Sequence, residues 1–136
     1  MRTNRSIPRC TVIPELAYPD VTEAVDWLCR HFGFGVRLRI ANHRVQLNVG
    51  DGAIVVTELR GRGMDQAHGV MVRVEDVDAH FERAKRGGVQ ILREPTDYPY
   101  GERQYTAADL GGHIWKFTQS IADVAPEDWG GESVEL

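Results

Sequence analysis

The sequence predicts an α+β fold in which two βαβββ modules pair into one curved eight-stranded sheet around a cavity. Three observations support this prediction. Two stretches have the apolar spacing of amphipathic helices, strand-like runs flank each helix in the same order, and the two helical stretches superpose at a constant offset. A unit of one helix and four short strands buries its own sheet poorly, so both units are expected to form a single domain.

The first helix is expected within residues 19–34, PDVTEAVDWLCRHFGF, where apolar side chains recur at helical spacing. Asp20 stands where an N-cap residue accepts free backbone N–H groups, and Gly33 stands where a helix ends. One strand-like run precedes this helix and three follow it: TVIPELAY (11–18), FGVRLRI (34–40), HRVQLNV (43–49) and GAIVVTEL (52–59).

The second helix is expected within residues 75–89, EDVDAHFERAKRGGV, with Asp76 as its N-cap and Gly87 at its end. Asp76 follows Asp20 by 56 residues (76 − 20), and the same offset superposes the two helices. The flanking runs are GVMVRVE (69–75), VQILRE (89–94), RQYTAAD (103–109) and HIWKFTQ (113–119). Module one is therefore expected at about 10–59, a linker at about 60–67, module two at about 68–119 and a C-terminal tail at 120–136.

Composition narrows the class of protein. The chain has 136 residues, of which 42% are hydrophobic and 26% charged, as is usual for one globular domain. A formal charge of −4 and the lack of a long apolar run argue against nucleic acid and membrane partners. The basic N-terminus precedes no apolar signal region, so a cytoplasmic protein is expected. Cys10 and Cys29 form no CxxC motif and are expected to be reduced and structural.

Strand alternation predicts which side chains face the cavity. In GVMVRVE, the residues Val70 and Val72 alternate with Arg73, and the valines are expected to face the helix. The same reasoning gathers polar side chains on the opposite face: Glu15, Gln46, Asn48, Glu58, Arg73 and Lys116. Polar groups in a concavity cost free energy unless they are paired or hydrated, so this face indicates a binding pocket. Short strands solvated on one face remain the alternative.

The second module also carries a specific signature, Tyr-Gly-x-Arg-x-Tyr…Asp-x-x-Gly-His-x-Trp-x-Phe, which consists of Tyr100, Gly101, Arg103, Tyr105, Asp109, Gly112, His113, Trp115 and Phe117. With the duplicated βαβββ plan, this signature resembles the vicinal oxygen chelate superfamily, which includes glyoxalase I, extradiol dioxygenases and bleomycin-resistance proteins. The resemblance covers roughly residues 10 to 120. It implies two concave sheets around a site that holds a divalent metal in the enzymes of the superfamily.

The resemblance places four residues at the metal-ligand positions of those enzymes. Ile13 stands at the first histidine and Val56 at the first glutamate. Gly69, next to His68, stands at the second histidine, and Lys116 at the last glutamate. Isoleucine and valine offer no lone pairs, and a lysine repels a cation. No metal or other cofactor is therefore predicted, a divalent metal is disfavoured, and His68 is the one weak candidate ligand.

Two carboxylates are weak catalytic candidates. Glu15 and Glu58 each lie two residues beyond a ligand position, on strands expected to be parallel neighbours, so they are expected side by side. One of them could then be held protonated as a general acid or base, unless Lys116 or Arg73 neutralises the pair in a salt-bridged cluster. Whether the protein is an enzyme stays open on this basis.

His113 is expected to have a structural role in the turn before the last strand. It lies on the same strand face as Trp115, away from the cavity, where a neutral imidazole can bond a carbonyl and pack beside an aromatic ring. Asp109 is expected to accept backbone N–H groups in the Asp-Leu-Gly-Gly turn.

Two functions follow from these expectations. The favoured one is a small-molecule-binding protein of the bleomycin-resistance type, which holds a polar or aromatic compound between the modules through Gln46, Glu58, Arg103 and Lys116. The alternative is a metal-dependent lyase, isomerase or dioxygenase of the glyoxalase I type. Trp129 is a large apolar group in an acidic tail, and we expect it to pack on the partner subunit of a homodimer.

Overall fold

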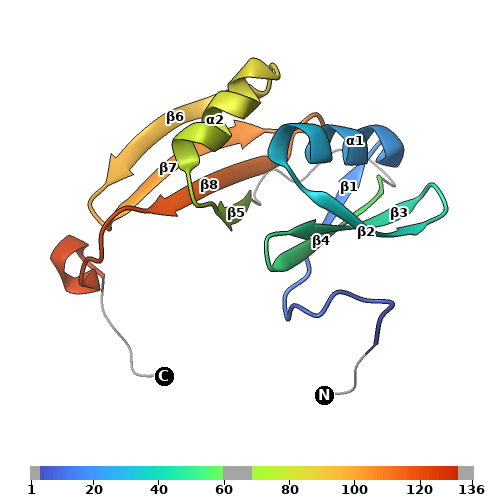
Figure 1. Cartoon of the computed structure of the whole chain (residues 1–136), viewed down its shortest axis with the longest axis horizontal. Helices are drawn as coiled ribbons and strands as arrows, with labels where there is room; N and C mark the ends of the chain where they lie inside the picture. The colour runs from blue at the N-terminus through green and yellow to red at the C-terminus, as the bar shows by residue number, and fades with distance from the viewer. Residues whose placement is uncertain (1–3, 60–68, 132–136) are drawn as a thin grey trace. The chain divides into compact units, whose positions relative to one another are not determined.

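The computed structural model describes residues 4–59 and 69–131. It confirms the α+β class and the repeated βαβββ plan, with the strands grouped in two four-stranded sheets (Figure 1). The elements are β1 (Glu15–Tyr18), α1 (Val21–Phe32), β2 (Gly35–Ile40), β3 (Arg44–Val49), β4 (Gly52–Glu58), β5 (Gly69–Arg73), α2 (Val77–Arg86), β6 (Gln90–Tyr98), β7 (Glu102–Ala108), β8 (Ile114–Ser120) and the short 3₁₀ helix η1 (Pro126–Trp129).

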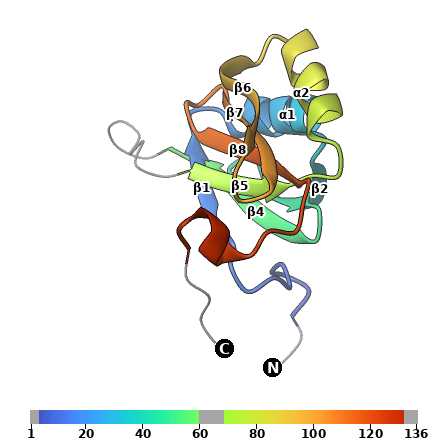
Figure 2. The same ribbon diagram turned by 90° about the vertical axis from the view of Figure 1, so that its left-hand side faces the viewer.

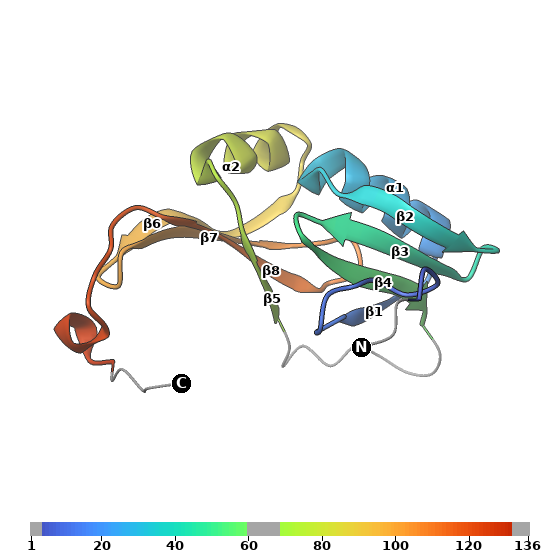
Figure 3. The ribbon, with the colours of Figure 1, turned by 60° about the horizontal axis from the view of Figure 1, so that its bottom comes forward.

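The N-terminal sheet has the strand order β1-β4-β3-β2, in which β1 runs parallel to β4 and the other pairs are antiparallel. Helix α1 covers one face (Figure 3). The carboxylate of Asp20 accepts the backbone N–H of Glu23 at 3.0 Å, and Gly33 ends the helix in a left-handed conformation with φ of 79°. The structure buries the predicted apolar face (Val21, Ala24, Val25 and Leu28) and also Phe32.

The C-terminal sheet repeats this arrangement in the order β5-β8-β7-β6, with β5 parallel to β8. Asp76 caps α2 by accepting the backbone N–H of Ala79 at 3.0 Å. The side chains beneath the helix include Tyr105, Trp115 and Phe117, all 0% exposed. The face predicted from alternation is therefore the buried one.

The chain forms two compact units. One contains β1 to β4 and α1, and the other contains β5 to β8, α2 and the C-terminal segment. The turn Asp109–His113 belongs to the first unit, although β7 and β8 on either side of it belong to the second. Neither α1 nor α2 is long and apolar enough to cross a membrane, and the described residues contain no other helix that is.

The C-terminal segment leaves β8 and forms η1 (Figure 2). The carbonyl of Gly101 accepts the backbone N–H of Ile121 at 2.8 Å. Trp129 packs edge-on against Tyr100, with ring centroids 5.4 Å apart, and stays 44% exposed. The tryptophan expected on a partner subunit thus has a contact within its own unit.

Candidate binding pocket

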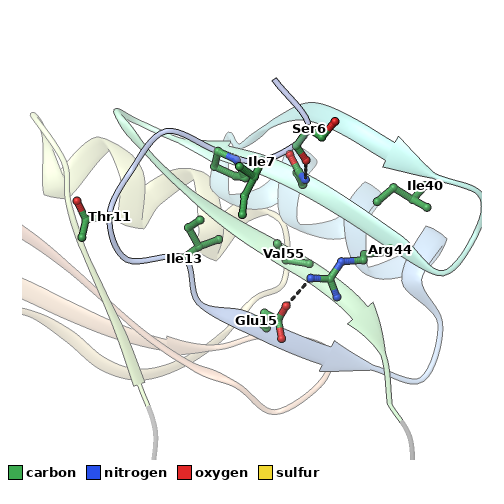
Figure 4. Close-up of a pocket in the computed structure, with 10 residues that line it drawn as sticks. Ser6, Ile7, Thr11, Ile13, Glu15, Ile40, Arg44 and Val55 are labelled. Carbon is green, nitrogen blue, oxygen red and sulfur yellow. Dashed lines mark hydrogen bonds and ion pairs between the residues drawn. The ribbon is translucent and has the colours of Figure 1, made fainter. Parts of the chain in front are cut away.

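The face of the N-terminal sheet that points away from α1 carries the candidate pocket. Strand register places Glu15, Gln46 and Val55 side by side on this open face, whereas Leu16 and Val56 face the helix. A cavity of about 460 Å³ lies over the open face (Figure 4). Its lining combines apolar and polar groups: Ser6, Ile7, Pro8, Thr11, Ile13, Glu15, Ile40, Arg44, Gln46 and Val55.

Residues 4–13, here called the N-terminal segment, supply four of the lining side chains from Ser6 to Thr11, together with Ile13. The guanidinium of Arg37 donates to the carbonyls of Arg5 and Ile7, each at 3.1 Å. It also donates to Gln46 Oε1 at 2.5 Å. These bonds hold the segment over the sheet.

Arg37 lies on the open face, as alternation with Val36 indicates, and β2 has an irregularity at this position. Val36 is paired with Leu47 and Leu38 with Gln46, so Arg37 is an extra residue between two regular pairs. Such a bulge reverses the faces of the residues that follow it, so Ile40 joins the open face and Arg39 the face of α1. The alternation of Arg37 with Val36 and Leu38 was the signal that could have assigned it to the open face.

Gln46 was predicted to contact a ligand, and its side chain is already engaged in the structure. Its amide nitrogen donates to the carbonyl of Ser6 at 2.9 Å, its oxygen accepts from Arg37, and the residue is 4% exposed. Asn48 is exposed on the same strand and lines a separate cavity of about 250 Å³. The two predicted contacts therefore lie at different places on the sheet.

Glu15 and Glu58 do not form the expected carboxylate pair. The parallel register joins Glu15 to Val55 and Tyr18 to Glu58, so the two carboxylates lie at opposite ends of the strand pair and on opposite faces. Glu15 instead forms an ion pair with Arg44 in the pocket (Figure 4). The expectation was wrong because β4 is buried on both faces, and such a strand has no alternation from which its orientation can be read.

Arg103 was predicted to face the cavity and lies on the other side of its sheet. It shares the face of Tyr105, beneath α2, and donates to Asp78 and to Asp97, each at 2.9 Å. These hydrogen bonds, first the one to Asp97, raise its pKa above the ordinary value. Arg103 and the buried Tyr105 are two residues apart on one strand and therefore share a face. This spacing would have assigned Arg103 correctly.

Arg73 and Lys116 do lie on the open face of the C-terminal sheet, as alternation indicated. Lys116 is half-buried between Met71 and Thr106 on the neighbouring strands. Within residues 4–59 and 69–131, none of the ion pairs involves Lys116. Its role toward a ligand stays a prediction.

The open face of the C-terminal sheet also holds a hydrogen-bond chain that the sequence analysis missed. Tyr100 Oη donates to Gln104 at 3.1 Å, Gln104 donates to Thr118 at 3.1 Å, and Thr118 donates to Glu102 at 2.7 Å. Hydrogen bonds from Ser120 and Thr118 lower the pKa of Glu102, and burial opposes this shift. This series of hydrogen bonds thus ends on the ionised carboxylate of Glu102.

The turn Asp109–His113 is structural, as its sequence indicated. Asp109 accepts the backbone N–H groups of Gly111 and His113, each at 2.9 Å, and the hydroxyl of Tyr18 at 2.5 Å. His113 bonds the carbonyl of Ala17 through Nε2 at 2.8 Å, and its ring packs edge-on against Tyr18 at 4.7 Å. The carbonyl partner lies on β1 rather than in the turn. Burial, followed by the charge of Asp109, raises the pKa of Tyr18.

The residues at the metal-ligand positions do not fit a divalent metal. Val56 is 0% exposed and faces α1, so the expected ligand position in β4 was shifted by one residue. The neighbouring open-face residue is Val55, which also lacks a donor atom. Ile13 is an apolar part of the pocket wall, and Lys116 carries a positive charge. His68 lies outside the described residues, and among those described no three His, Cys, Asp or Glu side chains gather as a metal site requires.

Comparisons with known proteins agree with this fold. TioX from Micromonospora sp. ML1 is 39% identical, with a TM-score of 0.71 over 80% of this chain and 97% of that structure. An uncharacterized protein of Mycobacterium bovis is 27% identical over 131 residues, covering 82% of this chain and 84% of the relative. TnmS3, an antibiotic binding protein from Streptomyces sp. CB03234, shares the fold at 22% identity, with a TM-score of 0.66 over 79% of this chain and 93% of that structure.

A family model matches residues 7–117. This match spans most of both βαβββ modules and includes the signature from Tyr100 to Phe117. The chain therefore belongs to the Glyoxalase/Bleomycin resistance protein/Dioxygenase superfamily.

Proposed function

We propose that this chain is a small-molecule-binding protein of the bleomycin-resistance type, which holds a polar or aromatic compound in the pocket of the N-terminal sheet. The observation that carries the proposal is the cavity of about 460 Å³ on the open face. Ligand pockets typically have volumes of ~300–1,000 Å³ and combine an apolar lining with a few polar groups. This pocket has both properties.

The lining indicates which ligand chemistry fits. Ile7, Ile13 and Val55 offer apolar surface to a hydrocarbon or aromatic body. Arg44 adds a guanidinium with five N–H groups, and Glu15 accepts from one of them. The remaining N–H groups can donate to a carboxylate or phenolate oxygen, which favours an amphipathic ligand with an anionic group.

Binding is favoured over catalysis for two reasons. The residues at the metal-ligand positions are apolar or, at Lys116, positively charged, and the two candidate carboxylates, Glu15 and Glu58, lie apart. The antibiotic binding protein TnmS3 shares this fold and supports a role in small-molecule binding. We therefore place this chain with binding proteins rather than with the metal-dependent lyases, isomerases and dioxygenases of the superfamily.

A matched pair of variants tests the site. Ile40 lines the pocket and is 40% exposed, whereas Val36 lies on the same strand, is 41% exposed and is not part of the lining. We expect Ile40→Trp to fill the cavity and to weaken binding of anilinonaphthalene sulfonate, an aromatic anion, by about tenfold or more, which is ~1.4 kcal/mol. Val36→Trp should leave the affinity unchanged.

Isothermal titration calorimetry measures both affinities and the stoichiometry, which should be one dye per chain. Arg44→Ala should weaken binding further in the same assay, and Arg39→Ala, which removes an equal charge from the same sheet, should not. A wild-type protein that binds no dye, or equal losses in the two tryptophan variants, would contradict the proposed site.

We also propose a homodimer. Trp129 keeps 44% of its surface exposed after packing on Tyr100, and Met71 is 61% exposed, so apolar surface stays available in the second unit. Truncation after Ile121 should reduce the dimer mass measured by light scattering to that of a monomer and lower the thermal midpoint. An unchanged mass and midpoint would show that the tail has no part in assembly.

A further inference from the structure

The N-terminal segment forms part of the pocket without belonging to the sheet. From Asn4 to Pro14 the chain adopts no helix or strand, and it crosses the face that α1 leaves open (Figures 1 and 4). Ser6, Ile7 and Pro8 line the cavity from this side. This wall of the pocket, formed by Ser6, Ile7 and Pro8, is therefore not part of a strand of the sheet.

Side chains of the sheet hold this wall in place. Arg37 donates to two of its carbonyls, at Arg5 and Ile7, and Gln46 donates to a third, at Ser6. Gln46 also accepts from Arg37, so the two side chains act as one connected group. Pro8 is the buried residue of the segment. All three carbonyls thus depend on two side chains.

Such an attachment costs less to open than a strand would. Regions with few buried apolar contacts and no ladder open with a small fraction of the global unfolding free energy. Arg5, Ser6 and Ile7 are exposed, with Ile7 at 50%. Opening this segment exposes little additional apolar surface and leaves the sheet intact.

We propose that the N-terminal segment is a movable wall that sets the largest ligand the pocket accepts, and that Arg37 is the residue that holds it closed. The inference rests on the proposed function, because it concerns the same pocket. With the wall closed, the cavity admits a ligand that fits about 460 Å³. A larger ligand binds only to the open form. Its apparent affinity is therefore the intrinsic affinity multiplied by the fraction of molecules that are open.

Two dyes of the same chemistry and different size provide the test. Anilinonaphthalene sulfonate fits the closed pocket, and its covalent dimer is about twice as large. We expect Arg37→Ala to increase the affinity for the dimeric dye by about tenfold, since it removes the charge-assisted hydrogen bonds that hold the segment closed. The affinity for the monomeric dye should change less than threefold.

Arg39→Ala is the matched control. Arg39 is exposed on the same strand, two residues from Arg37, and pairs with Val45, whose side chain faces α1. The control removes the same charge and should leave the ratio of the two affinities at the wild-type value. Loss of positive charge weakens binding of the doubly charged dimeric dye, so a gain in the Arg37 variant cannot come from charge. An equal ratio in all three proteins would overturn the proposal.

Limited trypsin digestion gives a readout that needs no ligand. Cleavage after Arg5 and Arg9 lies within the N-terminal segment, and its rate follows the open population when closing is fast. Arg37→Ala should accelerate these cleavages by about tenfold, and Arg39→Ala should not. Equal rates would refute the role of Arg37 even if dye binds. Accelerated cleavage in a protein that binds neither dye would refute the proposed function and leave the attachment of the segment established.

Discussion

Replacing Tyr18 with phenylalanine tests how much the Asp109 turn contributes to stability. Tyr18 is 1% exposed, and its hydroxyl donates to Asp109 Oδ2 at 2.5 Å in a buried environment. The substitution keeps the ring, and therefore its edge-on packing against His113. It removes one donor from a buried acceptor, which costs ~1–3 kcal/mol because the acceptor has already lost its hydration.

The expected cost at the middle of this range, about 2 kcal/mol, corresponds to a clear shift in the melting temperature. Unfolding entropy is roughly 2.1 cal/mol/K per residue near 60 °C, so a chain of 136 residues should melt about 7 °C lower. Circular dichroism during thermal and urea unfolding measures both quantities. Tyr98→Phe is the control, since Tyr98 is half-buried and stacks on Tyr100. It should shift the midpoint by less than about 2 °C.

The same variant has a distinct pH profile. Burial and the neighbouring Asp109 raise the pKa of Tyr18 above its ordinary value of 10.0. Because the folded state holds this proton more tightly, the contribution is fully present below pH ~10 and is lost as pH rises further, by about 1.4 kcal/mol per pH unit. Tyr18→Phe should flatten the alkaline fall in stability by that slope. A loss below 0.5 kcal/mol at neutral pH, or an unchanged alkaline slope, would refute the reasoning.

Three further predictions use the same unfolding and titration assays. Gly111→Ala should destabilise the protein by about 1–3 kcal/mol, since a Cβ there would lie 2.7 Å from the Tyr18 ring, whereas Gly35→Ala, with nothing within 4 Å, should cost less than about 0.5 kcal/mol. Arg103→Ala should leave dye affinity unchanged, because its partners belong to α2 and β6 and not to the pocket; a tenfold loss would return it to the ligand site. Burial also raises the pKa of Tyr105, so Tyr105→Phe should likewise flatten the alkaline fall in stability, and a slope equal to the wild-type value would contradict this.

Much of the fold could be predicted because local rules and the global structure agree. Asp20 and Asp76 cap the helices as their sequence context indicated, and the alternation in β8 placed Trp115 and Phe117 in the core. The internal duplication predicted the order of strands and helices along the chain. These features depend on residues within a few positions of one another, where spacing in the sequence is informative.

The pocket was less predictable because it depends on register and on irregular backbone. Glu58 was assigned to the wrong face, since β4 is buried on both faces and a slip of one residue reverses every side chain. Ile40 reaches the pocket because of the bulge at Arg37, and Ile7 belongs to a segment without regular structure. Neither feature has a periodic signature. The sequence thus indicated a polar open face on each sheet, but most of the residues that line the cavity were not predicted.

The first unit needs the turn Asp109–His113, which is synthesised late, to complete its fold. Tyr18 and Asp109 are 91 positions apart, so the first unit lacks a buried partner until most of the chain has left the ribosome. Contacts of such long sequence separation slow folding, because the loop must close before the contact forms. A fragment that ends before β5 lacks Asp109, so the Tyr18 hydroxyl would lose this acceptor. The two modules, although they repeat one plan, are therefore synthesised in succession but completed together.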